Sequence, residues 1–130
     1  MKKKRRSDID FEIAFYEGIL GFYENYTDVL AVIGHLYTER GFFDKGLAVD
    51  LRLSRLHPNE PLVHYNLACS YALTAQTDLA FEALNRAVDL GYDAWQHMED
   101  DRDLNAIRED PRYLELLQRM RQPPDNSHRM

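Results

Sequence analysis

The sequence predicts an all-α protein in which antiparallel helix pairs stack into a solenoid. Apolar residues recur at three- and four-residue intervals along nearly all of the 130 residues, as they do on one face of an amphipathic helix. No stretch alternates apolar and polar residues as a half-buried strand would, and the connecting segments are short enough to make neighbouring helices antiparallel. The chain also repeats itself at an interval of 34 residues.

The first two helices are predicted from apolar spacing and from their ends. In the first, apolar residues recur from Ile9 onward, and the pattern ends near Glu24. The second runs from Thr27, a residue type suited to the N-cap, to Arg40. Gly41 should end it, because glycine readily adopts the left-handed conformation that follows many helices.

Three further helices are expected, with the bounds Asp44–Leu56, Glu60–Thr74 and Asp78–Leu90. Pro58 follows the first of them and Gly91 follows the last, and both residue types commonly mark helix ends. In the first of the three, the leucines expected to be buried are Leu47, Leu51 and Leu53.

The last quarter of the chain is less regular. Residues Tyr92–Met98 suit a short helix, and the acidic stretch Glu99–Asp103 is interpreted as a helix start or a solvated turn. Asp110 followed by Pro111 is a helix-start signal, because aspartate caps the N-terminus and proline fits the first helical position. It predicts a final helix over Arg112–Arg121.

One folded domain is therefore expected at residues 9–121, between a basic disordered tail at 1–8 and a disordered tail at 122–130. Within the domain we expect two full repeats and a degenerate closing unit: about 27–60, about 61–92 and 93–121.

The internal repeat is carried by small and aromatic residues in register. A shift of 34 places Gly34 on Ala68 and Tyr37 on Tyr71, so that small residues meet small and large residues meet large. Small residues at a crossing allow two helix axes to approach to about 8–10 Å. The poorest match is Asp50, which falls on a leucine.

At these positions the sequence resembles the tetratricopeptide repeat (TPR) family. The first unit carries the family's pattern at Leu30, Ile33, Gly34, Tyr37, Gly46 and Pro58. The second unit carries it at His64, Leu67, Ala68, Tyr71, Ala80 and Leu84. The match covers about residues 27–92 and departs where Tyr92 replaces the terminal proline. The region after it resembles the degenerate closing unit of short bacterial members.

The resemblance implies a non-catalytic scaffold whose concave groove binds a protein or peptide partner. The groove residues it implies are His35, Thr38, Leu62, Tyr65, Asn66, Cys69 and Leu73. Together they predict a neutral, partly aromatic surface suited to an extended or helical peptide. A clamp for a terminal carboxylate, which some members have, is not expected, because only Asn66 matches it.

The alternative function is self-association as a homodimer. The first helix is an unpaired half-repeat, and its aromatic residues are Phe11, Phe15, Phe22 and Tyr23. An open end of a repeat array needs a polar surface to stay soluble, so an aromatic one suggests pairing with a second copy.

The distribution of charge argues against a nucleic-acid partner. Five of the 16 basic residues lie at positions 2–6, which leaves eleven against 22 acidic residues in the rest of the chain. A body this acidic repels phosphates. The basic run is interpreted as a solvated tail, and contact with RNA, anionic lipid or an acidic partner is its alternative.

No catalytic residue, cofactor or metal is predicted. Gly18 and Gly21 lie within a helix and lack the lysine-serine sequel of a phosphate-binding loop. The histidines have no second ligand at helical spacing apart from two pairs, His35 with Glu39 and His97 with Asp101. Cys69 is interpreted as a small packing residue.

A cytoplasmic protein without a membrane span is expected. A single cysteine rules out an intramolecular disulfide and suits a reducing compartment. The residues after Arg6 are polar where a secretory signal is apolar, and no window approaches the roughly 18–20 apolar residues of a membrane helix.

Overall fold

The structure is a computed structural model that describes residues 4–122. These residues form seven α-helices and one 3-10 helix and contain no strand, which confirms the all-α prediction. The helices are α1 (Arg6–Leu20), α2 (Thr27–Arg40), α3 (Phe43–Leu56), α4 (Pro61–Leu73), α5 (Thr77–Asp89), α6 (Trp95–Asp100), the 3-10 helix η1 (Arg102–Ile107) and α7 (Pro111–Arg121).

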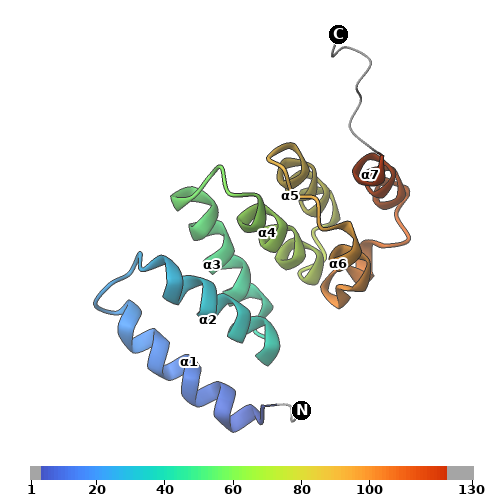
Figure 1. Ribbon diagram of the computed structural model, residues 1–130. Coiled ribbons are helices and arrows are strands. Elements are labelled where there is room, and N and C mark those ends of the chain that lie inside the picture. Colours follow the sequence, from blue (N-terminus) through green and yellow to red (C-terminus); the bar gives the residue numbers. More distant parts are fainter. Residues whose placement is uncertain (1–3, 123–130) are drawn as a thin grey trace.

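Helices that follow one another in the sequence pack against one another in space (Figure 1). Each of α1 to α4 contacts the helix after it. The chain then turns back, so that η1 packs against α4 while α7 packs against α5 and α6. As a result α4 is enclosed by α3, α5 and η1. We call α6 and η1 together, residues 95–107, the returning segment.

Local sequence signals mark the end of α2 and the start of α7. α2 has the predicted bounds, and Gly41 after it has a φ of 87°, in the left-handed region. Asp110 caps α7 through a hydrogen bond from the backbone N–H of Arg112 at 2.9 Å. Thr27, in contrast, is not the N-cap of α2. It is the first helical residue, and its hydroxyl lies 2.8 Å from Nε2 of His57.

The largest departures from prediction lie at the two ends. α1 begins at Arg6, inside the segment 1–8 that was expected to be a disordered tail, and it ends at Leu20 rather than near Glu24. α6 begins only at Trp95, and the 3-10 helix η1 follows it, beginning within the acidic stretch that was interpreted as a helix start or a solvated turn. The rest of the predicted tails, residues 1–3 and 123–130, lies outside the described residues.

The core is divided into two clusters. The larger joins α4, α5, α6, η1 and α7, and its most enclosed side chains include Tyr65, Leu84, Met98 and Leu104. The smaller joins α1 and α2. In α3, only Leu53 of the three predicted leucines is buried, while Leu47 and Leu51 are partly buried.

Two glycines allow α2 and α3 to approach closely. A Cβ atom at Gly34 would lie 3.2 Å from Cγ1 of Val49, and a Cβ atom at Gly46 would lie 3.2 Å from Oγ1 of Thr38. These contacts are tighter than ordinary van der Waals separation, so this crossing requires small residues, as the 34-residue register predicts.

Among residues 4–122, none of the helices combines the length and the apolar character needed to cross a membrane.

Candidate functional site: an acidic pocket beside α4

A pocket of about 360 Å³ lies where α2, α3 and α4 meet the segment that links α6 to η1. Its lining residues are Ala31, Gly34, His35, Thr38, Asp50, Leu53, Tyr65, Asn66, Cys69, Ser70, Leu73, His97, Asp101 and Asp103. Six of the seven groove residues implied by the repeat resemblance are among them. The seventh, Leu62, is 58% exposed in the first turn of α4 and does not line the pocket.

The pocket is acidic, not neutral as the sequence predicted. Asp50, Asp101 and Asp103 line it, and none of the residues around it is a lysine or an arginine. The prediction failed because these three aspartates lie outside the two helices that the resemblance implies for the groove. They reach the same space from α3 and from the returning segment.

Asp50 brings a partly buried carboxylate to the pocket. Its Oδ2 atom accepts a hydrogen bond of 2.5 Å from the hydroxyl of Ser70. Burial raises the pKa of Asp50 from 3.8 to about 6, although the bond from Ser70 acts in the opposite direction. Asp50 forms no ion pair within residues 4–122. In the repeat register Asp50 falls on Leu84, which is fully buried in the larger core cluster, so the two matched positions differ in their surroundings.

Asp101 anchors the returning segment to α4. One carboxylate oxygen caps η1 by accepting the backbone N–H of Asp103 at 3.0 Å. The other accepts the hydroxyl of Tyr65 at 2.6 Å. The acidic stretch is therefore a helix start, one of the two interpretations that the sequence allowed, and it also forms a wall of the pocket.

Arg108 stabilises the backbone of this wall through hydrogen bonds. Its guanidinium donates to the backbone carbonyl of Met98 at 3.1 Å and also to the carbonyl of Asp101. The same group donates to the hydroxyl of Tyr113 at 2.6 Å. Both carbonyls also accept a backbone N–H, that of Met98 from Asp101 at 3.3 Å and that of Asp101 from Leu104 at 3.2 Å, so Arg108 adds a second donor to each. These bonds fix the backbone from which Asp101 and Asp103 extend.

Tyr65, one of the groove residues implied by the resemblance, lines the pocket as a buried wall residue. Only 1% of it is exposed, and its ring stacks on Tyr92 with the centroids 4.4 Å apart. Burial, with the negative charge of Asp101 close by, raises the pKa of its hydroxyl, which therefore stays a donor. The neighbouring Asn66 is exposed at the edge of the pocket and is the accessible polar residue of this turn.

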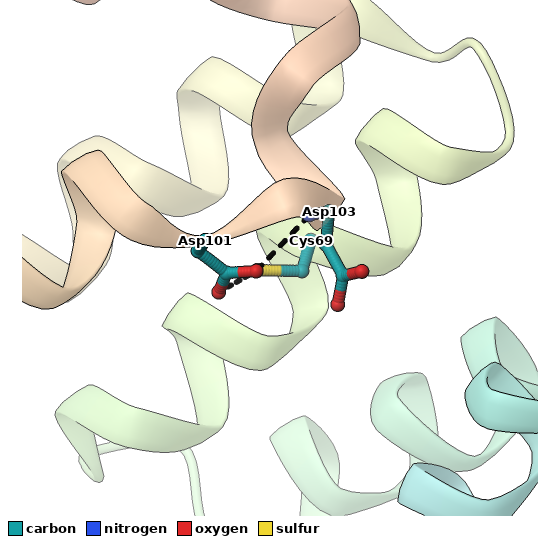
Figure 2. A group of neighbouring side chains, drawn as sticks. All are labelled: Cys69, Asp101 and Asp103. Carbon is teal, nitrogen blue, oxygen red and sulfur yellow. Dashed lines mark hydrogen bonds between the residues drawn. The ribbon is translucent and has the colours of Figure 1, made fainter. Parts of the chain in front are cut away.

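Cys69, Asp101 and Asp103 form a compact group that was not predicted (Figure 2). Their ligand atoms all lie within 4.8 Å of one another, so they are a candidate set of metal ligands. No sequence signal indicates this group, because 32 residues separate Cys69 from Asp101. Figure 2 shows the Cys69 side chain, from α4, between the two aspartates of the returning segment.

The protonation of Cys69 decides what this group can do. Burial raises the pKa of the thiol, and the negative charges of Asp101 and Asp103 raise it further. The thiol donates to Asp101 across 3.7 Å. Because the thiolate is both the nucleophile and the metal ligand, these surroundings disfavour both kinds of chemistry. The carboxylates remain as acceptors.

Asp103 completes the acidic surface. Burial raises the pKa of its carboxyl, the charge of Asp101 adds to this effect, and His35 partly offsets it.

The two histidines at helical spacing form the pairs that the sequence indicated. His35 lies 2.8 Å from Glu39, and His97 lies 3.6 Å from Asp101. The pocket thus holds three carboxylates and only imidazoles to balance them.

No protein-family model matches the sequence, and the search of curated proteins finds no match either. The resemblance to TPR proteins rests on the residues of this chain alone.

Proposed function

We propose that the protein is a non-catalytic scaffold of the TPR type, which binds a protein or peptide partner by taking an arginine or lysine side chain into the acidic pocket. The observation that carries this proposal is the set of carboxylates of Asp50, Asp101 and Asp103, with no lysine or arginine around the pocket.

The partly buried carboxylate of Asp50 supports a cationic ligand. An ionised group removed from water is costly unless an opposite charge or hydrogen bonds compensate it. Within the described residues Asp50 has a hydroxyl partner but no ion pair. A guanidinium or ammonium in the pocket would supply the missing charge.

The shape of the site favours a side chain of a larger partner. A volume of about 360 Å³ lies at the small end of the roughly 300–1,000 Å³ typical of ligand pockets. Arginine suits it best, since its planar group offers five donors and binds carboxylates in pairs. The exposed Asn66 at the edge of the pocket could bond to the backbone of a bound peptide.

The test uses two fluorescent peptides of identical sequence that carry either arginine or citrulline at the centre. Citrulline keeps the shape of arginine and removes its charge. We expect the arginine peptide to bind at least about tenfold more tightly, which corresponds to about 1.4 kcal/mol. Fluorescence anisotropy at pH about 7.5 measures both affinities.

Asp103→Asn should reduce this preference, because it removes one carboxylate and keeps nearly the same shape. The matched control is Glu82→Gln, which neutralises an exposed carboxylate on α5 away from the pocket. Equal binding of the two peptides by the wild-type protein, or equal losses in the two variants, would sink the proposal.

A further inference from the structure

The helix α1 has two apolar faces, and the chain covers only one of them. Ile9 and Ile13 pack with residues of α2 in the smaller core cluster. On the opposite side, Phe11 is 74% exposed and Phe15 is 57% exposed. Phe22, just beyond the helix, is 86% exposed. A surface helix normally buries one apolar face and presents polar residues on the other.

The exposed face forms a continuous stripe without charge. Its three helical residues recur at intervals of four and three, which places them along one side of α1, and Phe22 follows just after the C-cap residue Gly21. We name this surface the α1 stripe: Phe11, Phe15, Gly18 and Phe22. Ala14 lies beside it and is also exposed. A Cβ atom at Gly18 would meet nothing within 4 Å, so the middle of the stripe is open and flat.

We propose that the α1 stripe is the interface of a two-fold homodimer, in which α1 packs antiparallel against α1 of a second copy. In this arrangement Phe15 lies over Gly18 of the other copy, and Phe11 lies beside its Phe22. The aromatic side chains then fill the flat centre of the opposing stripe. Each contact occurs twice, as a two-fold axis requires.

The charges at the two ends of α1 favour this orientation over a parallel one. At the N-terminal end Lys4 pairs with Glu12 at 2.7 Å and Arg5 pairs with Asp8 at 3.3 Å. Arg6 is the basic residue there without an ion pair among residues 4–122. The exposed Glu24 follows the C-terminal end, so antiparallel pairing brings Arg6 of each copy towards Glu24 of the other. Parallel pairing would bring like charges together.

The opposite end of the molecule does not provide a complementary surface for head-to-tail stacking. The exposed residues of α7 are mainly charged or polar: Arg112, Glu115, Gln118, Arg119 and Arg121. Leu114 is exposed there by itself. The exposed surface of α7 therefore does not match the α1 stripe, whereas the same stripe on another copy does.

The available area predicts a reversible dimer. A fully buried aromatic side chain contributes about 150–250 Å², so three phenylalanines from each copy give on the order of 1,000 Å² in total. This is the lower end of the range for specific interfaces. We therefore expect a dissociation constant in the micromolar range.

Sedimentation velocity over a concentration series is the first test. The wild-type protein should pass from monomer to dimer, and Phe11→Ser with Phe15→Ser should raise the dissociation constant at least about tenfold. The matched control is Leu79→Ser with Leu114→Ser, which removes exposed apolar side chains from α5 and α7. Circular dichroism checks that each variant keeps its helices. A wild-type protein that stays monomeric into the high micromolar range overturns the proposal.

A charge rescue tests the register. Phe15→Lys and Gly18→Glu should each be monomeric alone. When they are mixed, one half of the interface gains a Lys–Glu pair and the other half keeps the native Phe15 contact with Gly18, so a heterodimer should form. If the mixture stays monomeric while the wild-type protein dimerises, the proposed antiparallel register is wrong.

Discussion

At the scale of single residues, Asp50 lowers the stability of the folded protein and serves the proposed binding of a cation. Its carboxylate lies partly buried in the pocket wall with one hydroxyl partner, and removal from water raises its pKa to about 6. The folded protein is therefore destabilised wherever Asp50 is ionised. A residue kept at such a cost is characteristic of a binding site, where ligand contacts rather than folding determine the residue type.

Asp50→Asn should stabilise the protein at neutral pH and not at acidic pH. Because its pKa is higher in the folded state than the unfolded value of 3.8, the stabilising proton is fully bound below pH about 4 and is lost as the pH rises through about 6. Asparagine does not titrate and can still accept the bond from Ser70. We expect a gain of about 2 kcal/mol at pH about 7.5, and almost none at pH about 4.

Urea unfolding followed by circular dichroism at the two pH values measures this difference. Glu82→Gln serves again as the control and should change stability little at either pH. The interpretation of Asp50 fails if the advantage of the asparagine variant is the same at both pH values. The same variant should bind the arginine peptide more weakly, so that stability and affinity change in opposite directions.

At the scale of elements, the crossing of α2 and α3 depends on two glycines. Alanine is the better helix former by about 0.5–1 kcal/mol, but a Cβ atom at Gly34 would lie 3.2 Å from Cγ1 of Val49 and 3.7 Å from Oδ1 of Asp50. The crossing therefore has no room for the residue that helix propensity favours. Asp50 lies at this crossing, so the close packing also fixes the pocket wall.

Gly34→Ala should destabilise the protein by about 1 kcal/mol, since the cost of overpacking exceeds the gain in helix propensity. Gly18→Ala should instead stabilise α1 by about 0.5–1 kcal/mol, because its Cβ atom meets nothing. Thermal unfolding at low protein concentration, where the monomer dominates, compares the two. Opposite signs are expected, and a stabilised Gly34→Ala variant would contradict the account of the crossing.

Sequence signals identified the helices better than the site, because helix ends depend on local contacts and the site depends on contacts between residues far apart in the sequence. Gly41 and the Asp110-Pro111 pair act within one turn of their helices, so the ends of α2 and α7 could be predicted. The bond between Ser70 and Asp50 spans 20 residues, and the bond between Tyr65 and Asp101 spans 36. Both bonds join α4 to another part of the chain, and no local spacing in the sequence indicates them, so the acidic wall could not be predicted.

At the scale of the whole molecule, net charge should govern the encounter with a partner. From residue 7 onward the chain holds eleven basic and 22 acidic residues, and the pocket adds a local concentration of carboxylates. Such a field attracts cationic ligands and repels anionic ones over a distance set by the ionic strength, about 10 Å at 0.1 M salt.

The affinity for the arginine peptide should therefore fall as salt increases. Raising the NaCl concentration from about 50 mM to about 500 mM should weaken binding several-fold, mainly by slowing association. Stopped-flow fluorescence separates the two rate constants. The citrulline peptide is the control and should change little. A salt-independent association rate would show that the charge of the pocket does not guide binding.

The hydrogen bond from Tyr65 to Asp101 also makes the pocket depend on two distant parts of the chain. One wall of the pocket comes from α4, and the other comes from a segment more than 20 residues later that Arg108 holds in position. A chain interrupted after α5 would retain five helices and yet lack His97, Asp101 and Asp103. Such a shortened chain is expected to lose the proposed binding of a basic peptide, because one wall of the pocket is absent.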